Sequence, residues 1–87
     1  MDGKLSVVVA DDNERILSLL SDLLSSDEEI NVVGTAANGQ EAYEMIRKEK
    51  PDVVLLDIIM PKLDGLSVME KINKDSTLDK HPAFVVM

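Results

Sequence analysis

Residues 5–13 read Leu5-Ser6-Val7-Val8-Val9-Ala10-Asp11-Asp12-Asn13, an apolar and β-branched run that stops on two carboxylates. A short run of consecutive apolar residues predicts a strand that is buried on both faces, as in a parallel sheet. Similar runs occur at 30–36, 53–56 and 83–87. The sequence therefore predicts four strands, the first and third of which end directly before an aspartate.

The segment after the first run has the spacing of an amphipathic helix. Asp12 and Asn13 both fit its N-cap, because each offers a side-chain oxygen to the first free N–H groups of a helix. Apolar residues recur three or four positions apart, which places them on one face. We expect this face to pack on the core through Ile16, Leu19, Leu20, Leu23 and Leu24.

Two further helices are predicted between the later strands. Asn38 and Glu41 are spaced like the N-cap and third residue of a capping box, and Pro51 marks the end of that helix. Its expected inner residues are Ala42, Met45 and Ile46. Asp64 can cap the last helix, whose apolar side is expected to use Leu66, Met69 and Ile72, with Val68 adjoining.

Strands that alternate with helices predict a parallel sheet with right-handed crossover helices. The fold class is therefore α/β, a doubly wound parallel sheet in one domain over residues 1–87. The fourth run, Ala83 to Met87, is apolar and reaches the last residue. This indicates a domain that is incomplete within or after its fourth strand, with an exposed strand edge that favours a homodimer or other self-association.

Composition narrows the classes of function. The chain has 9 Lys and Arg against 17 Asp and Glu, a net charge of −8, and no cysteine. An acidic surface does not neutralise phosphates, so we expect no nucleic-acid binding by this segment. No apolar run approaches the ~20 residues that span a bilayer, and the N-terminus lacks a signal-peptide pattern. A cytoplasmic protein without membrane contact is the expectation.

Aspartates follow the two strands expected to be neighbours. Asp11 and Asp12 follow the first strand, and Asp57 ends the third. In open α/β sheets, ligands gather at the carboxyl ends of strands where the strand order reverses. Three close carboxylates either retain a proton or recruit a cation. With oxygen ligands alone, the fitting cation is Mg²⁺ or Mn²⁺, with Ca²⁺ as a substitute.

A cation there would let Asp57 act as a nucleophile toward phosphorus. It would neutralise the charge that otherwise repels a carboxylate from a phosphoryl group. Asp57 could then form an acyl phosphate. Each aspartate also has a plainer interpretation: Asp12 and Asp64 fit simple helix caps, and an aspartate after a strand is often a turn residue.

The segments Val9–Asn13 and 54–65, Val54-Leu55-Leu56-Asp57-Ile58-Ile59-Met60-Pro61-Lys62-Leu63-Asp64-Gly65, resemble the receiver domain of response regulators. The resemblance runs from Leu5 to Met87 and implies a flavodoxin-like receiver fold. It implies that Asp57 is the phosphoacceptor of a two-component system or phosphorelay. It also implies that Asp11, Asp12, Asp57 and the backbone carbonyl of Ile59 hold the metal.

The resemblance implies partners and an output as well. The phosphoryl donor would be a histidine kinase or a histidine-containing phosphotransfer protein. Finer details, including 10–13 and 38–41, are similar to receivers of sporulation regulators, which implies control of sporulation transcription by a domain not present here. The domain would be regulatory rather than an enzyme, at most assisting its own phosphorylation and dephosphorylation. Complete receivers have a hydroxyl residue just beyond strand four and a lysine at the end of strand five, and neither has a matching position in this sequence.

Two other functions use comparable folds. An aspartyl-nucleophile phosphatase or phosphotransferase of the haloacid-dehalogenase type carries a second aspartate two residues after the nucleophile, where this chain has Ile59. A flavin-binding protein needs a phosphate-cradling loop after the first strand, where Asp11 and Asp12 would repel a phosphate. Both alternatives therefore lack a residue or loop that they need.

Overall fold

The computed structural model describes residues 4–57, 65–75 and 81–86. Within these residues, four parallel strands alternate with three helices: β1 (Leu5–Ala10), α1 (Glu14–Ser25), β2 (Ile30–Ala36), α2 (Gly39–Glu49), β3 (Val53–Leu56), α3 (Gly65–Lys74) and β4 (Ala83–Val86). The strand order is β2-β1-β3-β4, so the first and third strands are neighbours. This order confirms the predicted doubly wound, flavodoxin-like α/β fold.

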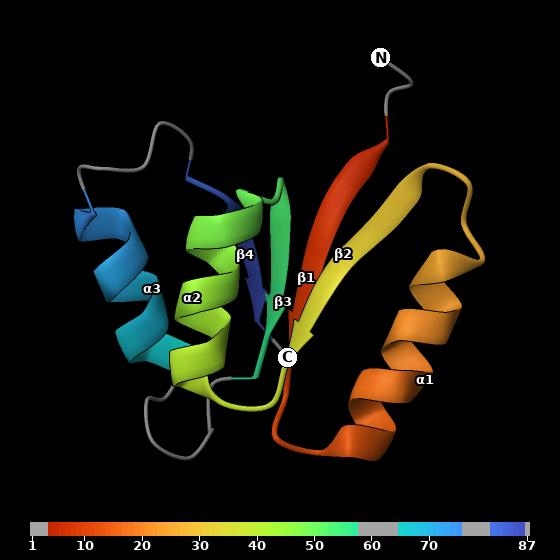
Figure 1. Ribbon diagram of the computed structural model, residues 1–87, viewed down its shortest axis with the longest axis horizontal. Helices are drawn as coiled ribbons and strands as arrows, with labels where there is room; N and C mark the ends of the chain where they lie inside the picture. Colours follow the sequence, from red (N-terminus) through yellow and green to blue (C-terminus); the bar gives the residue numbers. More distant parts are fainter. Residues whose placement is uncertain (1–3, 58–64, 76–80, 87) are drawn as a thin grey trace.

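Helices cover both faces of the sheet. Figure 1 shows α2 and α3 on one side of the strands and α1 on the other. The larger core lies under α2 and α3, where Ile46, Val68 and Ile72 pack on Val54 and Leu56 of the sheet and are fully buried. A smaller core lies under α1, around Val7 and Val9. The two cores explain why β1 is apolar at consecutive positions: successive side chains serve opposite faces.

The apolar stripe predicted for α1 is partly wrong. Leu17, which the spacing argument left out, is buried, and Leu20 and Leu24 pack beside it on the sheet. Ile16, Leu19 and Leu23 are instead 36%, 55% and 59% exposed. The helix carries two overlapping apolar stripes at helical spacing, and only one of them can face the sheet.

The ends of the first two helices follow the predicted signals. Asn13, not Asp12, is the N-cap of α1. Asn38 caps α2, and its side-chain oxygen accepts the Glu41 N–H at 2.9 Å. The Glu41 carboxylate accepts the N–H of Ala37 rather than that of Asn38, so the capping box is displaced by one residue. The helix ends at Glu49, and its C-cap residue Lys50 has a left-handed conformation directly before Pro51.

The third helix and fourth strand are described in part. Val68, expected only beside the inner face of α3, is fully buried together with Ile72, and Met69 packs at the rim of the same core. The side chain of Leu66, the Asp64 cap and Met87 lie outside the described residues. In β4, Val85 and Val86 are 48% and 43% exposed. Self-association through this strand stays a prediction.

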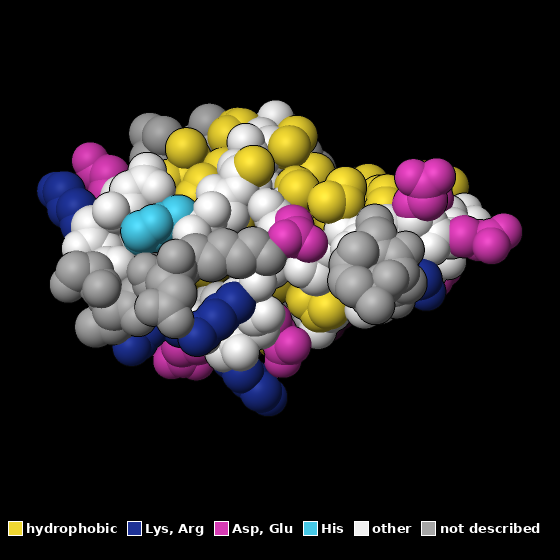
Figure 2. Space-filling model, turned by 90° about the horizontal axis from the view of Figure 1, so that it is seen from above, with side chains coloured by type: hydrophobic (Ala, Val, Ile, Leu, Met, Phe, Trp, Pro, Cys, Tyr) yellow, Lys and Arg dark blue, Asp and Glu magenta, His cyan; other side chains and the backbone are white. Residues whose placement is uncertain are grey.

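Surface features add two observations. Hydrophobic side chains gather along one long side of the molecule in the view of Figure 2. None of the helices in the described ranges has the length and apolar character needed to cross a membrane.

Candidate metal centre

The candidate site begins where β1 and β3 end side by side. Ala10 and Leu56 are partners in the parallel ladder, so Asp11 and Asp57 are each the first residue beyond it. The N–H of Asp57 donates to the carbonyl of Ala10 at 3.0 Å, and the N–H of Asp11 donates to the carbonyl of Ala36 at 3.0 Å. These bonds extend the ladders by one residue and fix both backbones at the carboxyl edge of the sheet.

The structure brings Asp11, Asp12 and Asp57 together. One carboxylate oxygen of each lies within 4.8 Å of those of the other two. Asp11 is 8% exposed, Asp57 is half-buried and Asp12 is exposed. The cluster therefore has a buried floor at Asp11 and opens to solvent on the side of Asp12.

Electrostatics at this site disfavour a third negative charge. Burial raises the pKa of the Asp11 carboxyl above its usual value of 3.8, and the charges of Asp57 and Asp12 act in the same direction. The hydrogen bond from the Asn13 backbone opposes this rise. A divalent cation would relieve both the burial cost and the mutual repulsion, so three carboxylates in this arrangement fit a hard cation with oxygen ligands.

Asn13 connects the cluster to α1. Its backbone N–H donates to Oδ1 of Asp11 at 2.9 Å. Its side-chain oxygen accepts the N–H groups of Arg15 at 2.9 Å and Ile16 at 3.3 Å. The residue that starts the helix therefore also orients the Asp11 carboxylate. Sequence reasoning found the cap and missed this second bond, although an aspartate that accepts the N–H two residues later is a common turn signal.

Replacing Asn13 tests this connection. Asn13→Ala removes the cap and should lower the free energy of unfolding by about 1 kcal/mol, whereas Asn13→Ser should retain most of it. The Ala variant should also bind Mg²⁺ more weakly than the Ser variant, because the backbone that orients Asp11 is less restrained. Urea unfolding and calorimetric titration with MgCl₂ measure the two effects. Equal metal affinity in both variants would show that the cap does not support the cluster.

The backbone carbonyl of Ile59, which the family resemblance implies as a further metal ligand, lies outside the described residues. The same holds for Pro61 and Lys62 of the similar segment 54–65, whose last residue, Gly65, is the first residue of α3. His81 is exposed, and its Nε2 lies 3.3 Å from the backbone oxygen of Asp75. Among the residues that the structure describes, the acidic cluster thus rests on Asp11, Asp12 and Asp57 alone.

A match to a known protein family covers nearly the whole chain. The sequence model of a family described as response regulator receiver domain matches residues 7–87. The chain is also 47% identical over 72 residues to protein-glutamate methylesterase/protein-glutamine glutaminase 1 of Syntrophomonas wolfei. That match covers 83% of this chain and 20% of the relative, so the chain spans a fifth of the relative's length.

Solved structures share the fold. The signal receiver domain of the response regulator NarL from Mycobacterium tuberculosis superposes with a TM-score of 0.84 at 35% identity, over 95% of this chain and 66% of that chain. A CheX–CheY complex with BeF₃ and Mg²⁺ from Borrelia burgdorferi superposes with a TM-score of 0.78 at 28% identity, over 94% of this chain and 61% of that chain. The chain spans less than two thirds of either structure.

Proposed function

Since this chain belongs to the response regulator receiver domain family, we propose that it is a phosphoacceptor switch segment in which Asp57 receives a phosphoryl group. The observation that carries the proposal is the convergence of three carboxylates at the ends of two neighbouring parallel strands. Asp57 is half-buried, and its backbone N–H is bound to the neighbouring strand. Asp11 is more buried than Asp57, and Asp12 is more exposed.

Asp11, Asp12 and Asp57 would hold a divalent cation, with the backbone carbonyl of Ile59 as a further ligand. Mg²⁺ is the proposed ion, with Mn²⁺ or Ca²⁺ as substitutes, because all the donors are oxygens. When bound, such an ion supplies positive charge that offsets the repulsion between the carboxylates and an incoming phosphoryl group. The solved relative from Borrelia burgdorferi, which contains Mg²⁺, supports this choice.

The proposed reaction is a transfer from nitrogen to oxygen. A carboxylate oxygen of Asp57 attacks phosphorus and forms an O–P bond, while the N–P bond of a phosphohistidine breaks. The electron pair of that bond stays on the imidazole nitrogen, and the ring leaves as neutral imidazole because its other nitrogen carries a proton taken from solvent. Asp11 transfers no proton in this step. Its carboxylate would help to hold the cation beside Asp57.

The donor would be a histidine kinase or a histidine-containing phosphotransfer protein, and the site would act in the cytoplasm. In the curated relative, the matched region is a fifth of the protein. The activity that phosphorylation controls would therefore depend on the rest of such a protein. Control of sporulation transcription, which the finer sequence similarity favours, is one proposed output. The methylesterase and glutaminase named in that relative are a second, and an assay of the full-length protein would separate them.

The test uses a small phosphodonor. Incubation of the chain with acetyl phosphate and MgCl₂ should add one phosphoryl group, measured by intact-protein mass spectrometry. Omitting the metal or adding excess EDTA should suppress the adduct, because the cluster then repels the donor. An adduct that forms equally well in EDTA would contradict the proposed role of the acidic cluster.

A further inference from the structure

The strand β2 forms one outer edge of the sheet. The order β2-β1-β3-β4 leaves it paired with β1 alone among the described strands. Figure 1 shows β2 nearest the viewer, with α1 and α2 on either side of it. Its sequence, Ile30-Asn31-Val32-Val33-Gly34-Thr35-Ala36, contains none of the prolines or charged residues that commonly protect such an edge. Unpaired backbone groups on an edge can bind an added strand.

The accessible part of this edge lies at Thr35. The N–H of Asp11 donates to the carbonyl of Ala36, which shows that Ala36 faces β1. Because backbone groups alternate along a strand, those of Thr35 point away from β1. Thr35 is exposed. The ladder shifts register between Val7 and Val8 and leaves Val33 unpaired, so a docked segment would pair with the stretch after this bulge.

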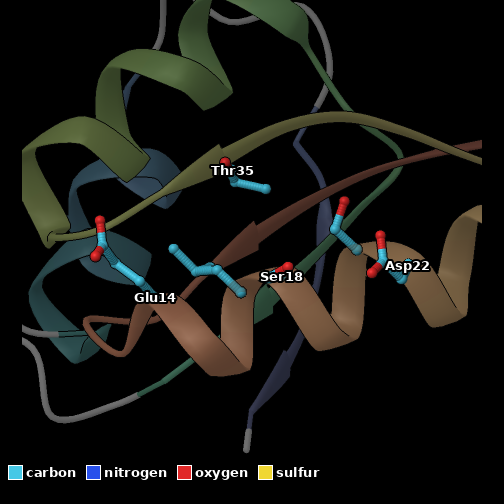
Figure 3. A pocket seen from close by; sticks show the side chains of 6 residues that line it. Glu14, Ser18, Asp22 and Thr35 are labelled. Atoms are coloured by element: carbon cyan, nitrogen blue, oxygen red, sulfur yellow. The ribbon is translucent and has the colours of Figure 1, made fainter.

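A groove flanks this edge on the side of α1. Its volume is about 300 Å³, and its lining residues are Glu14, Leu17, Ser18, Ser21, Asp22 and Thr35. Figure 3 shows Thr35 on β2 across from Glu14, Ser18 and Asp22 on α1. These lining residues supply two carboxylates and three hydroxyls, and none of them is lysine or arginine. Within the described residues, neither Glu14 nor Asp22 has a salt-bridge partner.

A second groove flanks the same edge on the side of α2. Its volume is about 210 Å³, and its lining residues are Thr35, Glu41, Glu44, Met45 and Lys48. Both glutamates of this groove accept hydrogen bonds: the Glu41 carboxylate accepts the Ala37 N–H, and the Glu44 carboxylate accepts an N–H of the Gln40 side chain. Lys48 adds a positive charge and Met45 an apolar surface. This groove therefore carries less negative charge than the first. Thr35 lines both grooves.

We propose that the β2 edge at Thr35, with its two flanking grooves, binds an extended segment of a partner protein in which basic and apolar residues alternate. Successive side chains of an added strand point to opposite faces, so neighbouring residues would enter opposite grooves. Basic side chains would lie between Glu14 and Asp22, and apolar ones would contact Met45. The net charge of −8 favours the approach of such a basic segment.

The test uses the peptide acetyl-Lys-Val-Lys-Val-Lys-Val-amide as the probe. In ¹⁵N NMR titrations, the largest shift changes are expected at Thr35 and at residues lining the two grooves. The peptide with glutamate in place of lysine should not bind. Two further peptides carry N-methyl groups on the lysine or on the valine amides, and only one of them should lose binding, because an added strand directs alternate amides toward β2.

Two protein variants complete the test. Glu14→Gln combined with Asp22→Asn should weaken peptide binding about fivefold, as expected for two exposed ion pairs. The matched control, Glu28→Gln with Glu70→Gln, removes two exposed carboxylates outside both grooves and should leave binding unchanged. Equal effects of the two pairs, equal binding of both methylated peptides, or shift changes away from Thr35 would overturn the proposal. The experiment needs no phosphorylation, so its result is independent of Asp57.

Discussion

Asp57→Asn is expected to take up no phosphoryl group from acetyl phosphate in the presence of Mg²⁺. The amide has nearly the same shape as the carboxylate, but it lacks the anionic oxygen that would attack phosphorus. The backbone bond from residue 57 to Ala10 does not involve the side chain, so the fold should persist. Intact-protein mass spectrometry measures the adduct, and circular dichroism measures the fold.

The matched control for this variant is Asp22→Asn. It makes the same chemical change at an exposed position on α1, away from the acidic cluster. Its adduct should form at the rate of the unchanged chain. If Asp57→Asn retained the adduct at that rate, another residue would be the acceptor, and the assignment of Asp57 would be wrong.

Asp11→Asn should have opposite effects with and without metal. Without metal, it removes one of three crowded carboxylates and should raise the free energy of unfolding, since burial and like charges disfavour the ionised form of Asp11. With Mg²⁺ at a hundred times its dissociation constant, the unchanged chain should gain about 2.7 kcal/mol of stability. The variant should lose most of this gain, because a ligand is missing. Urea unfolding with MgCl₂ or EDTA measures both effects.

The difference in folding stability between the unchanged chain and Asp11→Asn should depend on pH. The folded-state pKa of Asp11 is raised above 3.8, so the folded chain holds its proton to higher pH than the unfolded chain. The associated stability is present below 3.8 and is lost as pH rises through the raised pKa. In EDTA, the unchanged chain should therefore lose stability relative to Asp11→Asn across this window. A constant difference between the two proteins would contradict the electrostatic account of the cluster.

Much of the fold follows from local sequence signals. The β-branched runs that end at Ala10 and Leu56 predict buried strands, and the alternation with helices predicts a parallel sheet. The cap at Asn38 lies where it is predicted, and the cap at Asn13 is one of the two residues that the sequence offers for the first helix. These features depend on neighbours in sequence, so a single sequence is sufficient to find them.

The orientation of α1 depends on contacts that are distant in sequence. Leu17 and Leu19 are equally apolar, and helical spacing alone does not distinguish the stripe that contains each. The sheet makes the choice, because Leu17 packs near Val7 and Val9 while Leu19 remains exposed. The same limit applies to Val68, whose full burial depends on the close approach of α3 to the sheet.

The candidate site was more predictable than the packing. Once the first and third strands are neighbours, the aspartates that end them must meet at one edge, and the structure brings these groups within 4.8 Å. The link from Asn13 to Asp11 was missed because it depends on the exact turn between strand and helix. The roles of Asp11, Asp12, Asp57 and Ile59 in metal binding and phosphotransfer stay predictions.

The most direct measurement of the central claim is reductive trapping of the phosphorylated chain. Borohydride reduces an aspartyl phosphate to the corresponding alcohol, which converts the modified aspartate to homoserine. After treatment with acetyl phosphate and Mg²⁺, peptide mass spectrometry should find homoserine at residue 57 and at no other aspartate. Homoserine at Asp11 or Asp12, or a phosphoryl group recovered on His81, would contradict the account.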